Sequence, residues 1–363
     1  MEALLVAAKK EGLIASLAPL SIEDEDRARY DAWLAAGMAA GMEYLARTRE
    51  ARLFPERAFP WAKSALVVAA PYYFPEQEVP KGGLRLGRVA RYAWTRDYHL
   101  TLGEAVARLE ERARRLGLRA KGYVDHGPVM EGVLARAAGL GFLGKNTLLI
   151  RPGLGSYLLL GVVLLDYELK DFPEEVPSRC GSCTRCLSTC PVAALGPFGL
   201  DARRCISYWT IETRKPIPPE LWDAFGDWLF GCDDCQEACP WNRFAERGGY
   251  WRGFAPEPEL AHPDLWDFLR LSNRAFEKKY AGTAFLRPGR AGMARNAIRL
   301  LAATRHEALS DYLEAAAKDP SPLVRMAAAA GFYRLGKERL LDDPDPRVRA
   351  YARGLWAQSS PTG

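Results

Sequence analysis

The sequence lacks any hydrophobic run long enough to cross a bilayer, and its most apolar stretch, residues 157–165, has only the length of a buried strand. The N-terminus, MEALLVAAKKEGL, is expected to form an amphipathic helix. It has no basic start, no signal cleavage site and no twin-arginine pair. These absences predict a cytoplasmic protein without a membrane partner, in which thiols stay reduced and structural disulfides are not expected.

Motifs of the common nucleotide sites are also missing. No Gly-x-Gly-x-x-Gly follows a predicted strand, which argues against a Rossmann nicotinamide site. Residues 139–145 (GLGFLGK) lack Walker A spacing, and Asp125-His126-Gly127 fails the spacing of the Asp-x-His-x-x-Gly cobalamin motif. No acidic or nucleotide motif supports a nuclease or a ligase.

The positive charge that is present is concentrated in one region. The net charge is +5, and residues 285–363 alone contain 13 Lys and Arg against 8 Asp and Glu, so the rest of the chain is balanced. A basic tail on a neutral body favours a nucleic-acid partner, although a solvated helical face would have the same composition.

With 363 residues, the chain is long enough for more than one domain. Apolar runs and helical periodicity predict a first α/β domain, residues 1–170, with strands at 64–73, 120–124, 147–150 and 157–165 and helices at 101–117 and 129–138. Three further regions follow: a cysteine-containing domain (171–245), a connector (246–284) and a helical domain (285–363).

Two segments of the helical tail resemble each other: DPSPLVRMAAAAGFYRLG from Asp319 and DPDPRVRAYARGLWAQ from Asp343. Each has Asp-Pro-x-Pro, then x-Val-Arg, then a helix of small residues. HEAT-type repeats begin in this way, and a stack of them offers an extended surface to a large partner.

The eight cysteines fall into two related motifs and one single residue. C-x2-C-x2-C-x3-C-P is formed by Cys180, Cys183, Cys186 and Cys190; C-x2-C-x3-C-P is formed by Cys232, Cys235 and Cys239; the eighth is Cys205. In such motifs the closely spaced cysteines bind one cluster. The last cysteine, directly before the proline, binds the other cluster. The spacing therefore predicts two [4Fe–4S] clusters: the first on Cys180, Cys183, Cys186 and Cys239, the second on Cys190, Cys205, Cys232 and Cys235.

Zinc knuckles are the alternative to iron–sulfur clusters, because they also use C-x2-C pairs. They rarely use the longer motif, however, and no cysteine is left over here. A two-cluster electron carrier would be far shorter than this chain. The clusters are therefore predicted to transfer electrons to a reaction site elsewhere in the protein.

Several segments resemble the epoxyqueuosine reductases, a family of cobalamin-dependent iron–sulfur enzymes that modify tRNA. They are RYAWTRDYH (91–99), YVDHGPVMEGVLARAAGLGFLGKNTLLI (123–150), GSYLLLG (155–161), CGSCTRCLSTCP (180–191), RCISYWTIE (204–212) and GCDDCQEACPWN (231–242). The resemblance covers nearly the whole chain. It implies an α/β cobalamin-binding domain of the nitroreductase and reductive-dehalogenase type, a ferredoxin-like two-cluster domain and a HEAT-like tail that binds tRNA.

The resemblance also implies the reaction: reduction of epoxyqueuosine to queuosine at the tRNA wobble position, with the epoxide oxygen leaving as water. This takes two electrons, relayed by the clusters to cobalamin, and two protons. The implied partners are a tRNA anticodon stem–loop and an unidentified electron donor, and the chain is expected to be a monomer.

Asp125 is the candidate proton donor, because the family's catalytic aspartate falls in the same Val-Asp motif. A protonated Asp at neutral pH needs a raised pKa, which burial against a corrin would provide. The alternative is a helix cap for residues 129–138. The family commonly has an acid followed by Arg a few residues later, whereas this chain has Glu131 and Gly132; Arg136 is a candidate replacement.

Matching motifs imply further contacts. For the cofactor these are Arg52, Ala90, Arg91, Asp125, Lys145, Asn146, Leu149, Ser156, Leu160, Ser207 and Asp233, with His99 bordering cofactor or substrate. Independently of these motifs, four arginines recur at near-helical spacing before the repeats and are candidates for contact with tRNA phosphates: Arg287, Arg290, Arg295 and Arg299. Each of these residues could instead have a purely structural role, in the core of a strand, in a turn or on a solvent-exposed helix face.

Two other functions are compatible with part of the sequence. A reductive dehalogenase-like cobalamin enzyme would act on a small organohalide, but the basic tail and the missing export signal argue against it. A non-catalytic iron–sulfur electron carrier or binding module would have clusters and repeats without cobalt chemistry, and bound corrin would exclude it.

Overall fold

The computed structural model describes residues 1–171, 173–196 and 199–357, and the chain divides into two compact units. The first contains residues 1–76, 95–203 and 233–256; the second contains residues 77–94, 204–232 and 257–363. The units interleave along the chain, and the domain boundaries at 170, 245 and 284 stay predictions.

A four-stranded antiparallel sheet, in the order β1–β2–β7–β4, forms the centre of the first unit. Its strands are β1 (Ile14–Pro19), β2 (Ser64–Pro71), β7 (Leu158–Leu165) and β4 (Ala120–Tyr123). The apolar runs correctly predicted β2, β4 and β7. β1 was not predicted, because it is a short, mostly half-buried edge strand without a continuous apolar run.

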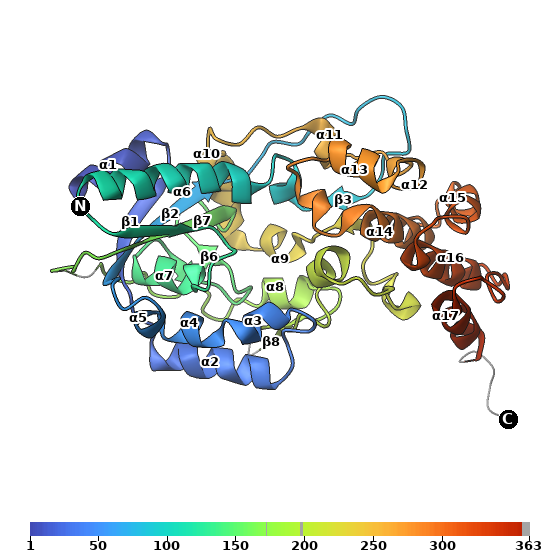
Figure 1. Cartoon of the computed structure of the whole chain (residues 1–363), viewed down its shortest axis with the longest axis horizontal. Helices are drawn as coiled ribbons and strands as arrows, with labels where there is room; N and C mark the ends of the chain where they lie inside the picture. Colours follow the sequence, from blue (N-terminus) through green and yellow to red (C-terminus); the bar gives the residue numbers. More distant parts are fainter. Residues whose placement is uncertain (172, 197–198, 358–363) are drawn as a thin grey trace. The chain divides into compact units, whose positions relative to one another are not determined.

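Helices cover both faces of this sheet, so β2 and β7 are buried on both sides and read as continuous apolar runs. α6 (Tyr98–Arg115) packs on one face and α7 (Glu131–Ala137) on the other (Figure 1). Gly161 of β7 allows the close approach of α6, since a Cβ there would lie 2.7 Å from a methyl carbon of Val106. α6 starts three residues before the predicted position, because the Asp97 side chain accepts a hydrogen bond from the His99 amide and caps the helix.

The remaining elements of the first unit are mostly short. They are α1 (Glu2–Lys10), α2 (Asp24–Ala35), α3 (Glu43–Arg47), α4 (Arg49–Leu53), α5 (Pro55–Ala58), α8 (Arg185–Thr189), α9 (Asp234–Glu237), α10 (Ala245–Gly248), β5 (Phe142–Leu143), β6 (Leu149–Ile150), β8 (Leu195–Gly196), β9 (Gly199–Leu200) and a 3₁₀ turn (Pro240–Phe244).

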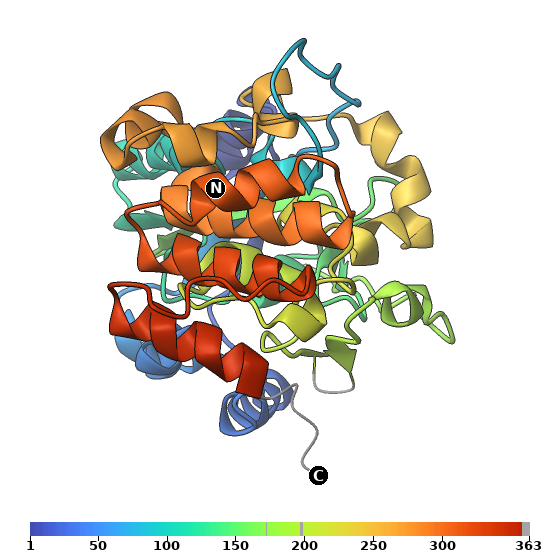
Figure 2. The same ribbon diagram turned by 90° about the vertical axis from the view of Figure 1, so that its right-hand side faces the viewer.

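The second unit is mainly helical, with one parallel pair of strands, β3 (Arg88–Val89) and β10 (Trp228–Phe230). Its helices are α11 (Pro258–Ala261), α12 (Asp267–Arg270), α13 (Asn273–Lys279), α14 (Gly289–Ala303), α15 (Leu309–Ala316), α16 (Pro322–Arg334) and α17 (Pro346–Ala357), with a π-helical turn (Tyr208–Glu212) and 3₁₀ turns (Arg91–Ala93, Pro219–Leu221, Ala284–Leu286). α14 to α17 lie side by side as a stack (Figure 2). No helix in the described part of the chain combines the length and apolar character that a membrane span requires.

The two similar tail segments have the same structural role. Asp319, before α16, accepts two hydrogen bonds from Arg290 of α14, at 2.7 and 2.9 Å. Asp343, before α17, accepts two from Arg325 of α16, at 2.8 and 3.1 Å. Each aspartate also accepts the amide two residues later, which fixes the turn into the next helix. The repeated Asp and Arg therefore join successive helices, while the assignment to the HEAT class stays a prediction.

Asp319→Asn should destabilise the helical stack by roughly 3–5 kcal/mol, because it leaves the buried Arg290 guanidinium without a counter-charge. Urea unfolding followed by circular dichroism measures the change, with Asp311→Asn, on the exposed side of α15, as the matched control. Equal stability of the two variants would contradict this role for the ion pair.

Candidate cluster cavity and proton-donor loop

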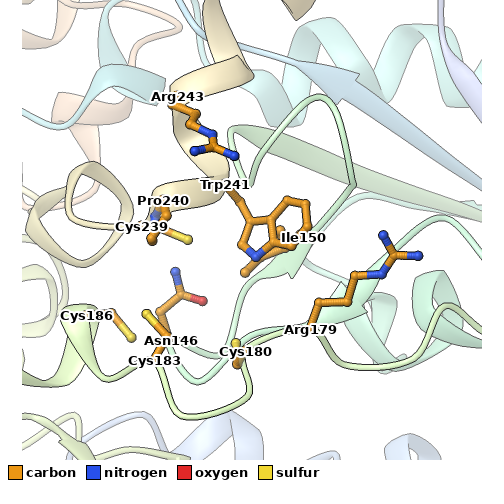
Figure 3. A pocket seen from close by; sticks show the side chains of 10 residues that line it. All are labelled: Asn146, Ile150, Arg179, Cys180, Cys183, Cys186, Cys239, Pro240, Trp241 and Arg243. Atoms are coloured by element: carbon orange, nitrogen blue, oxygen red, sulfur yellow. The ribbon is translucent and has the colours of Figure 1, made fainter.

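Four cysteine side chains line one cavity of about 230 Å³ in the first unit (Figure 3). They are Cys180, Cys183, Cys186 and Cys239, the set that the spacing predicts for the first cluster. Across the described residues, no three His, Cys, Asp or Glu side chains converge as a single metal ion would require. The thiols surround a volume instead, and such a donor set fits an iron–sulfur cluster.

Lys145 holds the cysteine loop in place. Its Nζ donates to the carbonyl oxygens of Gly181 and Cys183, at 2.8 and 3.0 Å. Burial raises the pKa of the Cys186 and Cys239 thiols, and neighbouring cysteines of the cavity raise it further. These thiols therefore ionise readily only when a cation binds among them, as iron in a cluster would.

The other four cysteines are divided between the units. Cys190 and Cys235 belong to the first unit, where the Cys190 Sγ accepts a hydrogen bond from the Ala194 amide at 3.3 Å. Cys205 and Cys232 belong to the second unit. Their assignment to one cluster stays a prediction.

Asp125 lies on a constrained loop between β4 and α7. Its φ is +58°, a conformation that costs free energy for a residue other than glycine and is often retained at functional sites. The loop packs closely on Tyr123, since a Cβ at Gly127 would lie 2.6 Å from that ring. The first helical residue of α7 is Glu131 and its cap is Met130, so the alternative that Asp125 caps this helix is wrong.

Two polar side chains from the start of α6, Tyr98 and His99, meet at Asp125. The Tyr98 hydroxyl donates to Asp125 Oδ2 at 3.0 Å, and His99 Nε2 lies 3.1 Å from the same oxygen. His99 Nδ1 lies 2.7 Å from Asp97 Oδ1, so the imidazole bridges two carboxylates. Asp125 is 63% exposed and His99 36%, which leaves both open to a ligand.

The side chains around Asp125 and His99 shift the pKa values of the two groups in opposite directions. Burial lowers the pKa of His99, but the hydrogen bonds and charges of Asp125 and Asp97 outweigh it and raise that pKa to about 9. Burial raises the pKa of Asp125, but the hydrogen bond and charge of His99, the Tyr98 hydroxyl and the charge of Arg52 together hold it below its usual value. At neutral pH the carboxylate is therefore ionised and the imidazole carries the proton.

Glu131 was not singled out as a site residue from the sequence. Burial raises its pKa to about 7, and the negative charge of Asp125 also raises it. Its Oε1 is buried and has no hydrogen-bond partner among the described residues.

The proposed replacement by Arg136 is wrong, because its guanidinium pairs with Asp26, Glu23 and Glu175. The cations that act on Asp125 are His99 and Arg52 instead.

Most of the predicted cofactor contacts have partners within the protein. Arg52 is buried and donates to the carbonyls of Gly127 and Val129. Ser156 Oγ donates to Gln236 Oε1, and the Asp233 carboxylate accepts from Gln236 Nε2. Leu149 and Leu160 pack in the apolar core, Asn146 lines the cysteine cavity, and Ala90, Arg91 and Ser207 belong to the second unit. The cobalamin contacts therefore stay predictions.

Three of the four arginines predicted to contact tRNA are buried: Arg290, Arg295 and Arg299. Arg290 pairs with Asp319, and the other two donate to backbone carbonyls of residues 209–228. We correct the prediction for these three, because buried and bonded guanidinium groups have no surface to offer a phosphate. Arg287 is 55% exposed and pairs with Glu212, and its tRNA contact stays a prediction.

Two family models match the sequence. The 4Fe-4S double cluster binding domain matches residues 179–242, which contain all eight cysteines. Epoxyqueuosine reductase QueG, DUF1730, matches residues 52–126. An epoxyqueuosine reductase of Gloeobacter violaceus is 40% identical over 293 residues, 78% of this chain and 89% of the relative. One of Pseudomonas aeruginosa is 37% identical over 83% of this chain and 85% of its own.

The chain belongs to the epoxyqueuosine reductase family. It is accordingly an oxidoreductase with a double-cluster domain. A crystal structure of epoxyqueuosine reductase with an epoxyqueuosine-modified tRNA-Tyr stem loop matches with a TM-score of 0.85 and 29% identity, over 98% of this chain and 97% of that one. The enzyme from Streptococcus thermophilus matches with a TM-score of 0.85 and 28% identity, over 98% of both chains.

Cys239→Ser removes the one cavity thiol that comes from the distant second motif. We expect the iron content of the reconstituted protein to fall from about eight atoms per chain to about four, because one cluster loses a ligand. Iron analysis and the sulfur-to-iron charge-transfer absorption measure the cluster content. Ser182→Ala, in the same loop, is the control. Full iron content in Cys239→Ser would contradict the ligand set.

The free energy of unfolding should depend on pH through His99. Its pKa is about 9 in the folded protein against an ordinary 6.5, so its stabilising pairs are fully present below pH 6.5 and are lost as the pH rises through 9. The stability difference between wild type and His99→Gln should shrink over that range, and solvent screening keeps it small. Urea unfolding at several pH values measures it. A difference independent of pH would contradict the charged imidazole.

Proposed function

We propose that this chain reduces epoxyqueuosine in tRNA to queuosine, with Asp125 as the group that gives a proton to the departing oxygen. The observation that carries the proposal is the contact of Asp125 with His99 and Tyr98 in a member of this family. A related Bacillus subtilis enzyme has been solved with its catalytic aspartate loop swung out of the active site, which supports placing the chemistry on the corresponding loop here.

The overall change is balanced by two electrons and two protons. The epoxide carbon–oxygen bonds break, a carbon–carbon double bond forms, and the oxygen leaves as water. The clusters would bring electrons one at a time, and cobalamin, when bound, would supply a low-potential cobalt centre. What this chain's own residues provide is a positioned acid–base group for the oxygen.

Asp125 is ionised at rest, so it has to receive a proton before it can give one. The charged His99 imidazole lies within hydrogen-bond distance of Asp125 Oδ2, and Asp97 holds the opposite ring nitrogen. A proton can therefore pass from His99 Nε2 to Asp125 and on to the leaving oxygen. In this proposal Asp97 fixes the orientation of the ring and stabilises its charged form.

For tRNA, the family match and the stem loop bound by a solved relative support binding of an anticodon stem–loop. In this proposal the protein works in the cytoplasm as a monomer, and its electron donor is unidentified. Of the arginines proposed for phosphate contact, Arg287 keeps that role.

Asp125→Asn should lower the rate of deoxygenation about 10²–10⁴-fold, the usual contribution of a general acid. The protein is reconstituted anaerobically with iron, sulfide and cobalamin and mixed with a reductant and an epoxyqueuosine stem–loop. Mass spectrometry follows the loss of one oxygen. Asp24→Asn is the control, since that side chain is 97% exposed on α2. Equal rates in the two variants would overturn the role of Asp125, and no product with wild type would overturn the function.

A further inference from the structure

Asn146 is a buried polar side chain in the wall of the cluster cavity. It lies in the turn between β5 and β6 and is only 3% exposed. Its side chain lines the cavity together with the four cysteines predicted for the first cluster. Figure 3 shows the amide group of Asn146 among these cysteine side chains, pointing into the cavity. A hydrogen-bonding group therefore faces the position predicted for the first cluster.

The hydrogen bonds of the Asn146 amide to the protein are incomplete. Its Nδ2 has two N–H donors. Among the described residues, the one acceptor for Nδ2 is the Cys235 carbonyl oxygen at 3.4 Å, which is longer than a usual N–H···O bond. The Oδ1 accepts from the Leu148 amide, also at 3.4 Å. At least one buried N–H thus lacks an acceptor in the described part of the chain, although a buried donor normally has one.

The turn that carries Asn146 is held firmly against the cysteine loop. The Thr147 amide donates to the Gly144 carbonyl oxygen at 2.9 Å and closes the turn. Thr147 has a φ of +67°, which is rare for a β-branched residue and costs free energy. Lys145, on the same turn, donates from its Nζ to two carbonyl oxygens of the cysteine loop. The position of the Asn146 amide is therefore fixed by its surroundings.

We propose that Asn146 donates a hydrogen bond from its amide N–H to a sulfur of the first cluster and thereby raises the reduction potential of that cluster. Reduction adds one electron to the cluster, and no bond of the amide breaks. The added negative charge makes the sulfur a stronger acceptor, so the hydrogen bond stabilises the reduced form more than the oxidised form. The inference rests on the predicted ligand set of the first cluster, and it does not depend on the substrate.

A redox titration of the full chain, reconstituted with iron and sulfide alone, tests the proposal. Asn146→Leu keeps the approximate size of the side chain but has no N–H, so one of the two cluster reductions should move to lower potential. At a fixed potential, the ratio of reduced to oxidised cluster should fall about tenfold, which corresponds to about 59 mV for one electron. Thr184→Ala, exposed in the cysteine loop and without a side-chain cap bond, is the control and should shift neither reduction.

A second measurement uses the wild-type protein and does not depend on how well the variant folds. The chain has only four asparagines. With ¹⁵N in their side chains, electron–nuclear double resonance of the reduced clusters should show a ¹⁵N coupling that disappears in Asn146→Leu. Because this protein contains no cobalt, the coupling also separates the proposed role from the predicted cobalamin contact of Asn146.

Two results would overturn the proposal: no ¹⁵N coupling in wild type, or unchanged potentials in an Asn146→Leu protein with full iron content. If Asn146→Leu binds less iron, the coupling in wild type decides alone. Both readouts are made without substrate. If the protein forms no queuosine, the proposed function fails, and these measurements still decide the role of Asn146.

Discussion

The buried guanidinium of Arg52 donates to the carbonyls of Gly127 and Val129, at 3.1 and 2.9 Å, and so joins α4 to the loop between β4 and α7. This loop carries Asp125 in a left-handed conformation that the residue would not adopt unaided. The same cation lowers the pKa of Asp125. One side chain therefore both fixes the loop geometry and favours the ionised carboxylate, and the contacts of Asp125 with α6 depend on it.

The carboxyl groups of Asp125 and Glu131 have different pKa values because their surroundings differ. Asp125 meets a hydroxyl and a charged imidazole and is ionised, whereas Glu131 meets apolar strands and holds its proton to a higher pH. Carboxyls whose pKa values are pushed apart in this way can take different parts in proton transfer. The cysteine cavity uses burial differently, since it keeps the Cys186 thiol neutral until a cluster binds.

Local patterns predicted part of this structure well. The cysteine spacing identified the four side chains of the cavity, and apolar runs located β2 and β7, because both signals lie within short segments. The predicted tRNA contacts of Arg295 and Arg299 were wrong, since the sequence does not show that a guanidinium is buried against backbone carbonyls. The lowered pKa of Asp125 could not be predicted either, because it depends on His99, 26 residues away in sequence.

The central claim is that a charged His99 holds the proton for an ionised Asp125. The most direct measurement is the ¹⁵N chemical shift of the His99 ring in histidine-labelled protein with oxidised clusters, from pH 6 to pH 10. The signal is assigned by its loss in His99→Gln, and the chain has only four histidines. We expect both ring nitrogens to be protonated at pH 7.5 and the ring to titrate near pH 9. A neutral imidazole at pH 7.5, titrating near 6.5, would contradict it.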